Sequence, residues 1–293
     1  MIKIAVTGAS GMLGKAIVLE AQRRRYEVVA FFHSAPVLVS GVATEQLDIL
    51  DVDAVQAMLS RVRPHVVLHA AAETRVDWCE DHRDEAAQIN TEASRNLAQV
   101  AAHLGATFLY VSTDSVFDGT HGDYKETDTP LPLNVYANTK LGGEEAVLQF
   151  LPSSIVVRTN FYGWGSEHKA GLLDWIVREL ARGRSIPGFT DVMFCPLLVS
   201  DAATVLLDLL EHNVFGVFHV VGSEATSKCD FARNVALKFG YDPSLVKPSR
   251  LSDVAMRARR PLNTSLNVER LQIALGREMP GVAEGLSRLV KRR

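Results

Sequence analysis

The 293-residue sequence has few cysteines, little excess of charge of either sign and no long apolar run. Cys79, Cys195 and Cys229 are far apart and form no CxxC pair, so neither a disulfide framework nor a zinc–cysteine site is expected, and a reducing cytoplasm fits best. The 31 basic and 34 acidic residues give a net charge of −3, which argues against nucleic acid or an anionic membrane surface as a partner. No run reaches the roughly 18 apolar residues of a membrane span, and the N-terminal run is too short for a secretory signal. We therefore expect a soluble globular protein.

Two kinds of segment alternate along the first half of the sequence. Short apolar runs, typical of strands buried on both faces, occupy 2–7, 27–32, 65–70, 107–112 and 154–158. Stretches with apolar residues at helical spacing lie between them, at 12–24, 52–63, 86–104 and 135–151. This alternation predicts an α/β fold in which helices cover both faces of a parallel sheet.

A glycine-rich loop, Thr7–Gly14, follows the first predicted strand and opens the first predicted helix. Gly8 permits a tight turn, Gly11 allows the backbone to approach a pyrophosphate, and Gly14 allows the helix to pack closely on the sheet. The helix N-terminus supplies free N–H groups for the anion. Because the spacing occurs between a strand and a helix, we expect a dinucleotide cofactor to contact Gly8, Ser10, Gly11, Met12, Leu13 and Gly14.

The domain division follows from this loop. We expect a Rossmann-type, doubly wound nucleotide-binding domain over residues 1–160. Residues 161–293 contain helical stretches at 171–182, 201–211 and 229–239, and 250–267 show no clear period. Because no Gly/Ser-rich linker separates two halves, we expect 161–293 to form mainly a smaller, substrate-binding lobe, with segments near 192–222 returning to the large sheet.

The end of the second predicted strand bears on the choice of cofactor. A carboxylate there binds the ribose 2′-hydroxyl of NAD, but the strand ends in Phe32, His33 and Ser34. His33 and Ser34 are able to donate hydrogen bonds to a 2′-phosphate, which favours NADP(H), with NAD(H) possible; a plain surface histidine is the alternative for His33. Asp48 is a candidate for the adenine amino group, or else a turn residue, and we expect its neighbour Ile49 to contact the cofactor too.

Tyr136 and Lys140 are four residues apart on a predicted helix and therefore share a face. An ammonium near a phenol lowers the phenol pKa, and such a tyrosine exchanges a proton with a carbonyl or alcohol oxygen. Thr113 ends a predicted strand, where it is placed to hydrogen-bond a substrate oxygen, although turn capping is the alternative. These three residues are the candidate catalytic set. We expect Tyr136 and Lys140 to contact the cofactor as well, since the lysine is able to bond the nicotinamide ribose.

Together these motifs resemble the extended short-chain dehydrogenase/reductases, and among them the dTDP-4-dehydrorhamnose reductases. The matching stretches span nearly the whole chain: TGASGMLG (7–14), LHAAAETRVDWCE (68–80), YVSTDSVFDG (110–119), ETDTPLPLNVYANTKLGGEE (126–145) and RARRPLNTSLN (257–267).

The resemblance implies reduction of a nucleotide-linked 4-keto-6-deoxy sugar by hydride transfer from the nicotinamide to C4. Tyr136 would be the general acid, Lys140 would tune it, and Thr113 would orient the carbonyl. The resemblance also places further residues: Ala70, Ala71 and Ala72 beside the cofactor, and Thr74, Val76, Asp77, Thr113 and Asn160 beside the sugar. We add Arg260 as a donor to the anionic substrate. A homodimer is possible, and no local acidic cluster predicts a metal.

The sequence departs from the family pattern at two places near the expected sugar. Ser115 stands where the family has tyrosine, and Asn160 and Phe161 stand where it has tryptophan in the next segment. The identity of the sugar therefore stays open. Two alternatives also stay open: a non-catalytic NADP-binding regulatory subunit, like that of methionine adenosyltransferase, and another sugar-nucleotide epimerase, dehydratase or reductase. Of the tryptophans, we expect only Trp164 near the site.

Overall fold

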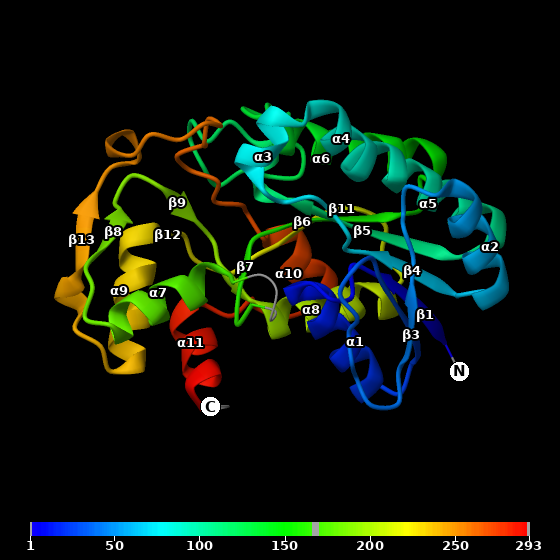
Figure 1. The fold of residues 1–293 in the computed structure, drawn as a ribbon, viewed down its shortest axis with the longest axis horizontal. Coiled ribbons are helices and arrows are strands. Elements are labelled where there is room, and N and C mark those ends of the chain that lie inside the picture. Colours follow the sequence, from blue (N-terminus) through cyan, green and yellow to red (C-terminus); the bar gives the residue numbers. More distant parts are fainter. Residues whose placement is uncertain (1, 166–169, 292–293) are drawn as a thin grey trace.

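A parallel sheet of seven strands forms the centre of the larger lobe in this computed structural model, which describes residues 2–165 and 170–291 (Figure 1). From one edge to the other the strands are β3 (Ala43–Gln46), β2 (Glu27–Phe32), β1 (Lys3–Thr7), β4 (Val66–His69), β5 (Thr107–Thr113), β6 (Ile155–Thr159) and β11 (Gly216–Val220). The order reverses between β1 and β4, which places a ligand crevice at the carboxyl ends of these strands.

Each strand sends alternate side chains to opposite faces of the sheet. In β1, Ile4 and Val6 pack in the same buried cluster as Ile17 of the first helix. Ala5, between them, belongs to the cluster on the other face, which includes Leu59. Both faces are apolar because helices cover both, as the sequence predicts.

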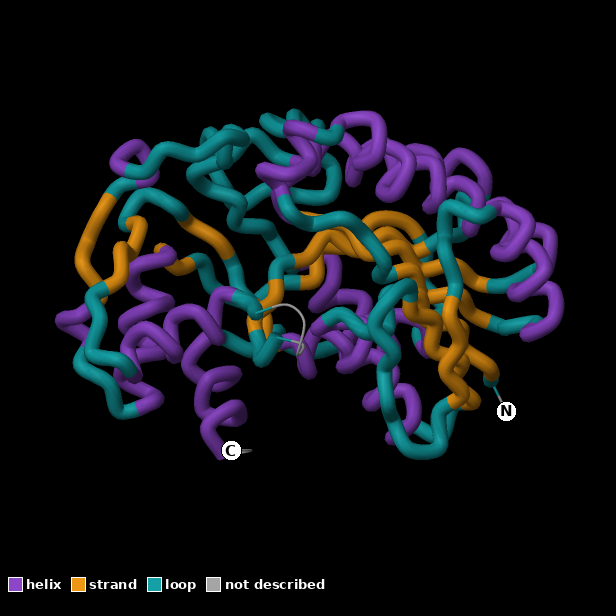
Figure 2. Tube along the Cα trace, in the orientation of Figure 1, coloured by secondary structure: helices purple, strands orange, loops and turns teal. Residues whose placement is uncertain are grey.

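The two helical layers are distinct (Figures 1 and 2). One face carries α1 (Met12–Arg23), α8 (Val199–Glu211) and α10 (Glu269–Leu275). The other carries α2 (Val52–Val62), α4 (Arg83–Ala87), the π-helical η1 (Gln88–Glu92), α5 (Ala93–Leu104) and α6 (Val135–Phe150). The short helix α3 (Val76–Asp81) and the 3-10 turn η2 (Asp114–Val116) follow β4 and β5.

The smaller lobe is built from short elements of the second half of the chain. Its helices are α7 (Leu172–Ala181), α9 (Lys228–Phe239) and α11 (Val282–Lys291), with the 3-10 turns η3 (Pro243–Leu245) and η4 (Leu251–Asp253). Its strands pair in twos: β7 (Phe161–Tyr162) with β10 (Leu197–Leu198), β9 (Met193–Phe194) with β12 (Thr226–Ser227), and β8 (Ile186–Phe189) with β13 (Val246–Ser249). One buried apolar cluster, including Leu173, Phe231 and Leu286, joins the three helices.

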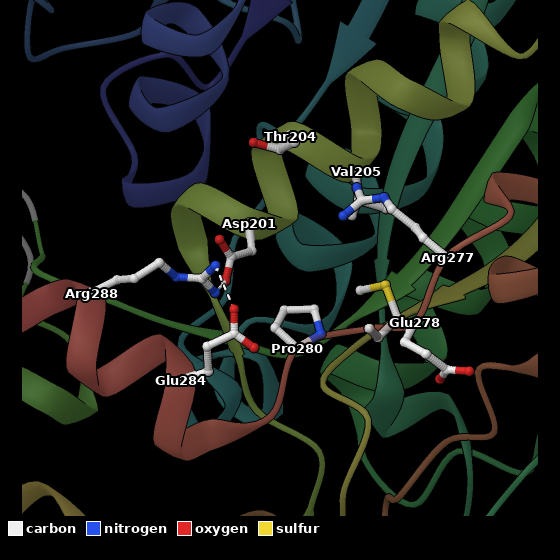
Figure 3. Close-up of a pocket in the computed structure, with 9 residues that line it drawn as sticks. Asp201, Thr204, Val205, Arg277, Glu278, Pro280, Glu284 and Arg288 are labelled. Carbon is white, nitrogen blue, oxygen red and sulfur yellow. Dashed lines mark hydrogen bonds and ion pairs between the residues drawn. The ribbon is translucent and has the colours of Figure 1, made fainter.

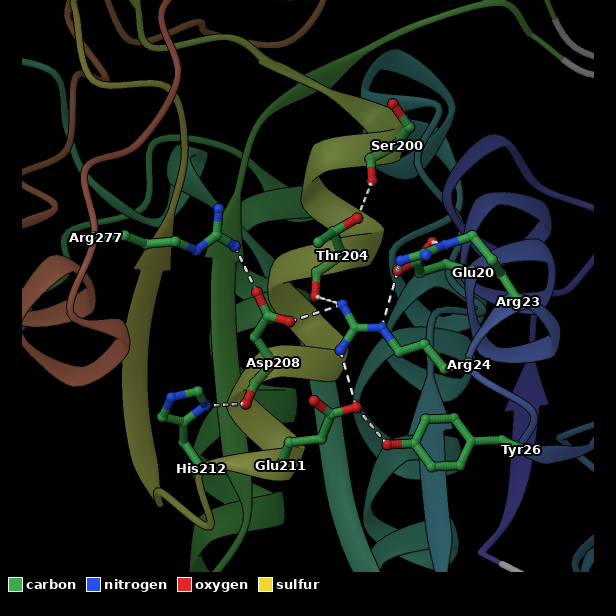
Figure 4. A network of polar contacts seen from close by, with 10 residues as sticks. All are labelled: Glu20, Arg23, Arg24, Tyr26, Ser200, Thr204, Asp208, Glu211, His212 and Arg277. Atoms are coloured by element: carbon green, nitrogen blue, oxygen red, sulfur yellow. Dashed lines mark hydrogen bonds and ion pairs between the residues drawn. The ribbon is translucent and has the colours of Figure 1, made fainter.

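Charged contacts tie α8 to elements on both sides. Arg24, just after α1, bonds Asp208 of α8 at 2.7 Å and Glu211 at 2.9 Å, and Asp208 also accepts from Arg277 (Figure 4). At the other end of α8, Arg288 of α11 bonds Asp201, beside a small cavity of about 190 Å³ (Figure 3). The returning helix α8 therefore joins the first helix of the chain to its last.

The structure confirms the expected fold class, a doubly wound α/β sheet with a smaller C-terminal lobe, and it refines two expectations. The predicted helix 86–104 contains the π turn η1, where the buried Asn90 side chain bonds the backbone of Glu73 (2.9 and 3.1 Å). Of the segments expected to return to the sheet, β11 pairs with β6 at its edge, whereas 193–198 form β9 and β10 in separate two-stranded sheets. The domain boundary at residue 160 stays a prediction. In the described part of the chain, no helix combines the length and apolar character needed to cross a bilayer.

Candidate functional site

Two adjacent cavities open at the carboxyl ends of the central strands. The first, of about 480 Å³, lies between the glycine loop, the ends of β5 and β6, and the start of α6. The second, of about 530 Å³, lies between this edge of the sheet and the smaller lobe. Consecutive residues connect them, since Thr113 lines the first cavity and Asp114 and Ser115 line the second. The strand order reverses at this edge, which is where open parallel sheets bind ligands.

The glycine loop approaches other backbone so closely that side chains are excluded. Gly8 has a φ of +68°, and a Cβ there would lie 2.6 Å from the backbone nitrogen of Ala71. A Cβ on Gly14 would overlap the carbonyl oxygen of Gly8. Among the described residues, no side chain caps α1 at Gly11, so the N–H groups of its first turn are left for an anion.

Most of the predicted cofactor residues come together in the first cavity. Those that line it are Gly8, Ser10, Gly11, Met12, Leu13, Gly14, Ser34, Ala70, Ala72, Tyr136 and Lys140. Further described residues, which were not predicted to bind the cofactor, also line it: Ala35, Val111, Ser112, Thr159, Phe161, Ala170 and Gly171.

Four predicted cofactor residues are not among the described residues that line this cavity. Ala71 packs beneath Gly8, and Ile49 packs against the apolar cluster under α2. His33 is exposed, with its Nε2 4.0 Å from Asp48 Oδ2. Asp48 accepts a hydrogen bond from the backbone of Leu50 at 2.9 Å, which is the turn role that the sequence analysis left open.

The candidate catalytic residues Thr113, Tyr136 and Lys140 all line the first cavity. Thr113 is the last residue of β5. Tyr136 and Lys140 lie one turn apart on α6, which begins after Asn134, a residue whose side chain accepts from the backbone nitrogen of Ala137 at 2.9 Å. The spacing in the sequence therefore does place both side chains on one face.

The pKa values of Tyr136 and Lys140 differ from those expected from the sequence. Burial raises the pKa of Tyr136 to about 12, although a hydrogen bond with Thr113 acts in the opposite direction. Burial also lowers the pKa of Lys140 to about 7, partly offset by Glu144, and its Nζ lies 4.1 Å from the centre of the Tyr110 ring. The pKa of Tyr136 is therefore raised, where a lowering was expected, because desolvation is the largest effect on both groups. Tyr136 is a neutral phenol at physiological pH.

A buried polar cluster holds α6 against the sheet beneath these side chains. Glu144 of α6 accepts from Arg158 Nη2 of β6 at 2.7 Å and from the hydroxyl of Ser112 of β5. The Arg158 guanidinium also lies 5.1 Å from the centre of the Phe117 ring. These contacts hold α6 in a fixed position against β5 and β6, the two strands whose carboxyl ends line the site.

The second cavity has apolar walls and a few polar groups. Its apolar lining comprises Leu172, Trp175, Ile176, Pro187, Phe189, Val192, Phe194, Ala232, Leu251, Val254, Met256 and Pro261. Its polar lining comprises Asp114, Ser115, Asn160, Lys228, Arg260 and Thr264. Asp114 is held in place by Asn160 Nδ2 at 2.8 Å and Thr264 Oγ1 at 2.7 Å. A large apolar cavity with few convergent polar groups is typical of a small-molecule site.

The predicted substrate residues divide between the cavities. Thr74 and Thr113 line the first, and Asn160 and Arg260 line the second. Val76 and Asp77, both on the first turn of α3, are not among the described residues that line either cavity. Asp77 instead accepts from Arg260 Nη2 at 3.0 Å and therefore positions that guanidinium at the second cavity.

Sequence reasoning missed Trp175 and Lys228. Trp164, which was expected near the site, packs edge-on against Phe239 with ring centres 5.7 Å apart. Trp175 lines the second cavity from α7, and its helical spacing alone did not distinguish it from a packing residue. Lys228 follows an ordinary helix N-cap, Ser227, at a point where β12 pairs with β9, and its local sequence gives no sign of the cavity that it lines.

Comparison with known proteins places the whole chain in one family. The model of the RmlD substrate binding domain matches residues 2–293. The probable low-salt glycan biosynthesis reductase Agl14 of Haloferax volcanii is 34% identical, covering 97% of this chain and 96% of that protein. Methionine adenosyltransferase 2 subunit beta of Bos taurus is 36% identical, covering 97% and 87%. The crystal structure of dTDP-4-dehydrorhamnose reductase from Bacillus anthracis in complex with NADP has a TM-score of 0.90 at 27% identity, covering 100% of both chains.

The matches confirm the resemblance seen in the sequence, and the structural match covers the whole fold described above. The chain belongs to the RmlD substrate binding domain family, within the extended short-chain dehydrogenase/reductases.

Proposed function

We propose that this protein reduces a nucleotide-linked 4-keto-6-deoxy sugar, with Tyr136 as the general acid. The observation that carries the proposal is the junction of the two cavities. Thr113, Tyr136 and Lys140 line the first, and Asp114, Ser115 and Asn160 continue directly into the second. A ketone at this junction is within reach of a phenol and a hydroxyl, while the second cavity has room for the nucleotide.

The first cavity suits a nicotinamide dinucleotide. The uncapped start of α1 suits a pyrophosphate, and a Cβ at Gly8 or Gly14 would overlap backbone atoms. NADPH bound there would supply the hydride. Ser34, at the rim, is a donor for a 2′-phosphate and no carboxylate follows β2 directly, so we propose a preference for NADPH over NADH. The Bacillus anthracis reductase, which binds NADP, supports this choice.

The protonation states fit reduction. Tyr136 carries its proton at neutral pH, because its pKa is raised to about 12. A developing alkoxide is more basic than a phenolate, so proton transfer from Tyr136 to the sugar oxygen remains favourable. Thr113 donates a second hydrogen bond that orients the carbonyl. Lys140, when protonated, stabilises the phenolate that remains, and it is placed to bond ribose hydroxyls of the cofactor.

Substitution of Tyr136 tests the proposal. Wild-type protein should consume NADPH when given a dTDP-4-keto-6-deoxy sugar, and Tyr136→Phe should lower kcat by about two orders of magnitude or more, the usual scale of acid catalysis. Absorbance of NADPH measures turnover, and fluorescence titration measures its binding, which should be unchanged. Tyr241→Phe, which alters a tyrosine of the smaller-lobe core, is the matched control and should keep full activity.

A separate experiment defines the specificity for the sugar nucleotide and for the cofactor. It measures turnover of thymidine, uridine and guanosine diphosphate ketosugars, each with NADPH and with NADH.

A second candidate is a non-catalytic, NADP-binding subunit of another enzyme. It is favoured by the 36% identity to methionine adenosyltransferase 2 subunit beta. If the wild type binds NADPH tightly but turns over none of the ketosugars, this second function replaces the first. Because Thr113, Tyr136 and Lys140 are all present and together, we place the reductase first.

A further inference from the structure

Lys228 is a cation that lines the second cavity, and its charge has no evident role in stabilising the fold. It is the first residue of α9. The helix start is already capped by Ser227, whose Oγ accepts from the backbone nitrogen of Asp230 at 2.9 Å. A positive charge in the first turn opposes the helix dipole, and its partial burial adds a desolvation cost. The position of Lys228 therefore costs stability.

The surroundings of Lys228 leave the hydrogen-bond donors of its ammonium free. Its Nζ lies 3.4 Å from the centre of the Phe194 ring, which favours the charge but accepts no conventional hydrogen bond. Its backbone N–H donates to the carbonyl oxygen of Val192 at 2.9 Å, but among the residues that the structure describes none accepts a hydrogen bond from its ammonium or forms an ion pair with it. Asp114 attracts it through space, but Asp114 Oδ2 already accepts from Asn160 and Thr264. Its Oδ1 accepts from the hydroxyls of Thr113 and Ser115.

The cavity contains one cation that is not held in an ion pair. The charged residues among its described lining are Asp114, Lys228 and Arg260. Arg260 is paired with Asp77 outside the lining, so Lys228 is the lining cation that forms no ion pair with a described residue. The remaining walls are aromatic and aliphatic, including Trp175 and Phe189, and suit a nucleobase.

We propose that Lys228 binds the diphosphate of the nucleotide-linked sugar and thereby selects nucleotide-activated sugars over free ones. This inference rests on the proposed function. With the ketone at Thr113 and Tyr136, the sugar extends past Asp114 into the second cavity, and the next group along the substrate is its diphosphate. Lys228 lines that cavity close enough to Asp114 to interact with it electrostatically.

Binding of dTDP, the nucleotide without the sugar, tests this role directly. We expect calorimetric titration of the NADPH-loaded protein to show at least tenfold weaker dTDP binding in Lys228→Met than in wild type. Lys238→Met, which removes an exposed lysine of the same helix, is the matched control and should bind dTDP as the wild type does. NADPH affinity should be equal in all three proteins, which establishes that the variants are folded.

The pH dependence gives a second readout that a purely structural lysine would not change. Burial lowers the pKa of Lys228 to about 8, and Asp114 partly offsets this. Arg260 is the other charged residue of the described lining, and Asp230 lies on the same helix as Lys228. Wild-type affinity for dTDP should therefore fall as the pH rises through about 8, whereas Lys228→Arg, which stays charged, should show a flatter profile.

The possible outcomes separate the inference from the function on which it rests. If wild type binds dTDP and Lys228→Met binds it equally well, the inference is overturned and the proposed reductase stands. If Lys228→Met binds dTDP normally but has a raised KM for the ketosugar, the lysine contacts the sugar and the diphosphate role is overturned. If wild type binds NADPH but no nucleoside diphosphate, the proposed function itself fails.

Discussion

Lys140 is a single residue that is both buried and, in the proposed reaction, charged, and these two properties oppose each other. Its side chain is only 2% exposed, in contact with the Tyr110 ring, yet the proposed chemistry needs its charge. Burial lowers its pKa to about 7, so the free protein holds the ammonium at a cost. Stability is thus given up at a position that the proposed reaction uses, as is common at functional sites.

This cost predicts that Lys140→Met stabilises the cofactor-free protein. Below pH 7 both folded and unfolded chains carry the proton, and the full cost of the buried charge applies. Between about pH 7 and 10.5 only the unfolded chain keeps it, so the cost fades as the pH rises. Urea unfolding should show the variant more stable by about 2–4 kcal/mol at pH 6, with the gain shrinking towards zero by about pH 10. An equal gain at both pH values would contradict this account, and the exposed Lys238→Met should change little at either.

Among single residues, the sequence predicted those site residues whose positions depend on nearby sequence. Tyr136 and Lys140 share one helix, and Thr113 ends a strand of obvious pattern. Lys228 was missed, because it lies 114 positions after Asp114 in the chain and only the tertiary fold brings the two into one cavity. The lowered pKa of Lys140 was missed for a related reason, since desolvation depends on packing that the sequence does not reveal.

At the scale of elements, the turn from β1 to α1 depends on two glycines that act differently. Gly14 lies so close to the loop backbone that an added Cβ would overlap the Gly8 oxygen. At Gly11 the nearest atom to an added Cβ is the same oxygen at 3.2 Å, and its φ of −74° suits any residue. Gly14 is therefore required by packing within the protein, whereas Gly11 leaves room that we assign to a pyrophosphate.

We predict that Gly14→Ala and Gly11→Ala have separable effects. Gly14→Ala should lose NADPH binding and about 2 kcal/mol or more of unfolding free energy, because backbone must move to relieve the overlap. Gly11→Ala should keep its stability within about 1 kcal/mol and lose only NADPH affinity. Thermal unfolding and fluorescence titration measure the two effects. If Gly14→Ala kept wild-type stability, the close approach of Gly14 to the Gly8 backbone would not be important for stability.

Element boundaries were predicted well where polarity and propensity agree. The helices 12–24 and 135–151 and the strands at 27–32 and 107–112 match α1, α6, β2 and β5 to within a residue or so. The π turn η1 was not visible, because it accommodates hydrogen bonds of Asn90 with Glu73 and Thr139, which are 17 and 49 positions away. The pairs of two-residue strands were not visible either, since such short strands carry no period.

At the scale of the whole molecule, two buried histidines lie in the central sheet. His69 of β4 is fully buried, with Nδ1 2.6 Å from Thr7 Oγ1. His219 of β11 is also fully buried, with Nδ1 3.2 Å from the carbonyl oxygen of Asn267. Burial lowers the pKa of each to about 3. Both are neutral in the folded protein and protonate near pH 6.5 in the unfolded chain.

The protein should therefore lose stability as the pH falls through about 6.5. In the window between about pH 6.5 and 3 the unfolded state binds protons that the folded state does not, so each histidine favours unfolding on acidification. Between pH 7 and pH 5, His219→Gln should lose about 2 kcal/mol less unfolding free energy than wild type. The control is His212→Gln, at an exposed position. Parallel loss in His219→Gln and wild type would show that His219 already titrates normally in the fold.

The overall architecture was predictable because most strands and helices of the first 160 residues carry their own pattern, although β3 and α3 were not predicted. The arrangement of the second half was less so. Helix α8 and strand β11 complete the large lobe, whereas β9 and β10, equally apolar, go to the smaller one. Which lobe a segment joins depends on the surfaces that the rest of the fold presents to it. This is a property of the whole fold and cannot be deduced from the segment alone.

The late position of β11 has a consequence for synthesis on the ribosome. The outer edge of β6 and the face of α1 that α8 covers are complete only when residue 220 has emerged, about 60 residues after β6 ends. At about 5–20 residues per second, this interval lasts roughly 3 to 12 s. During that time the nascent chain presents an unpaired strand edge and an apolar helix face, both of which favour association with other unfinished chains. Slow translation between residues 160 and 220 would therefore expose this protein to aggregation more than a delay anywhere after β11.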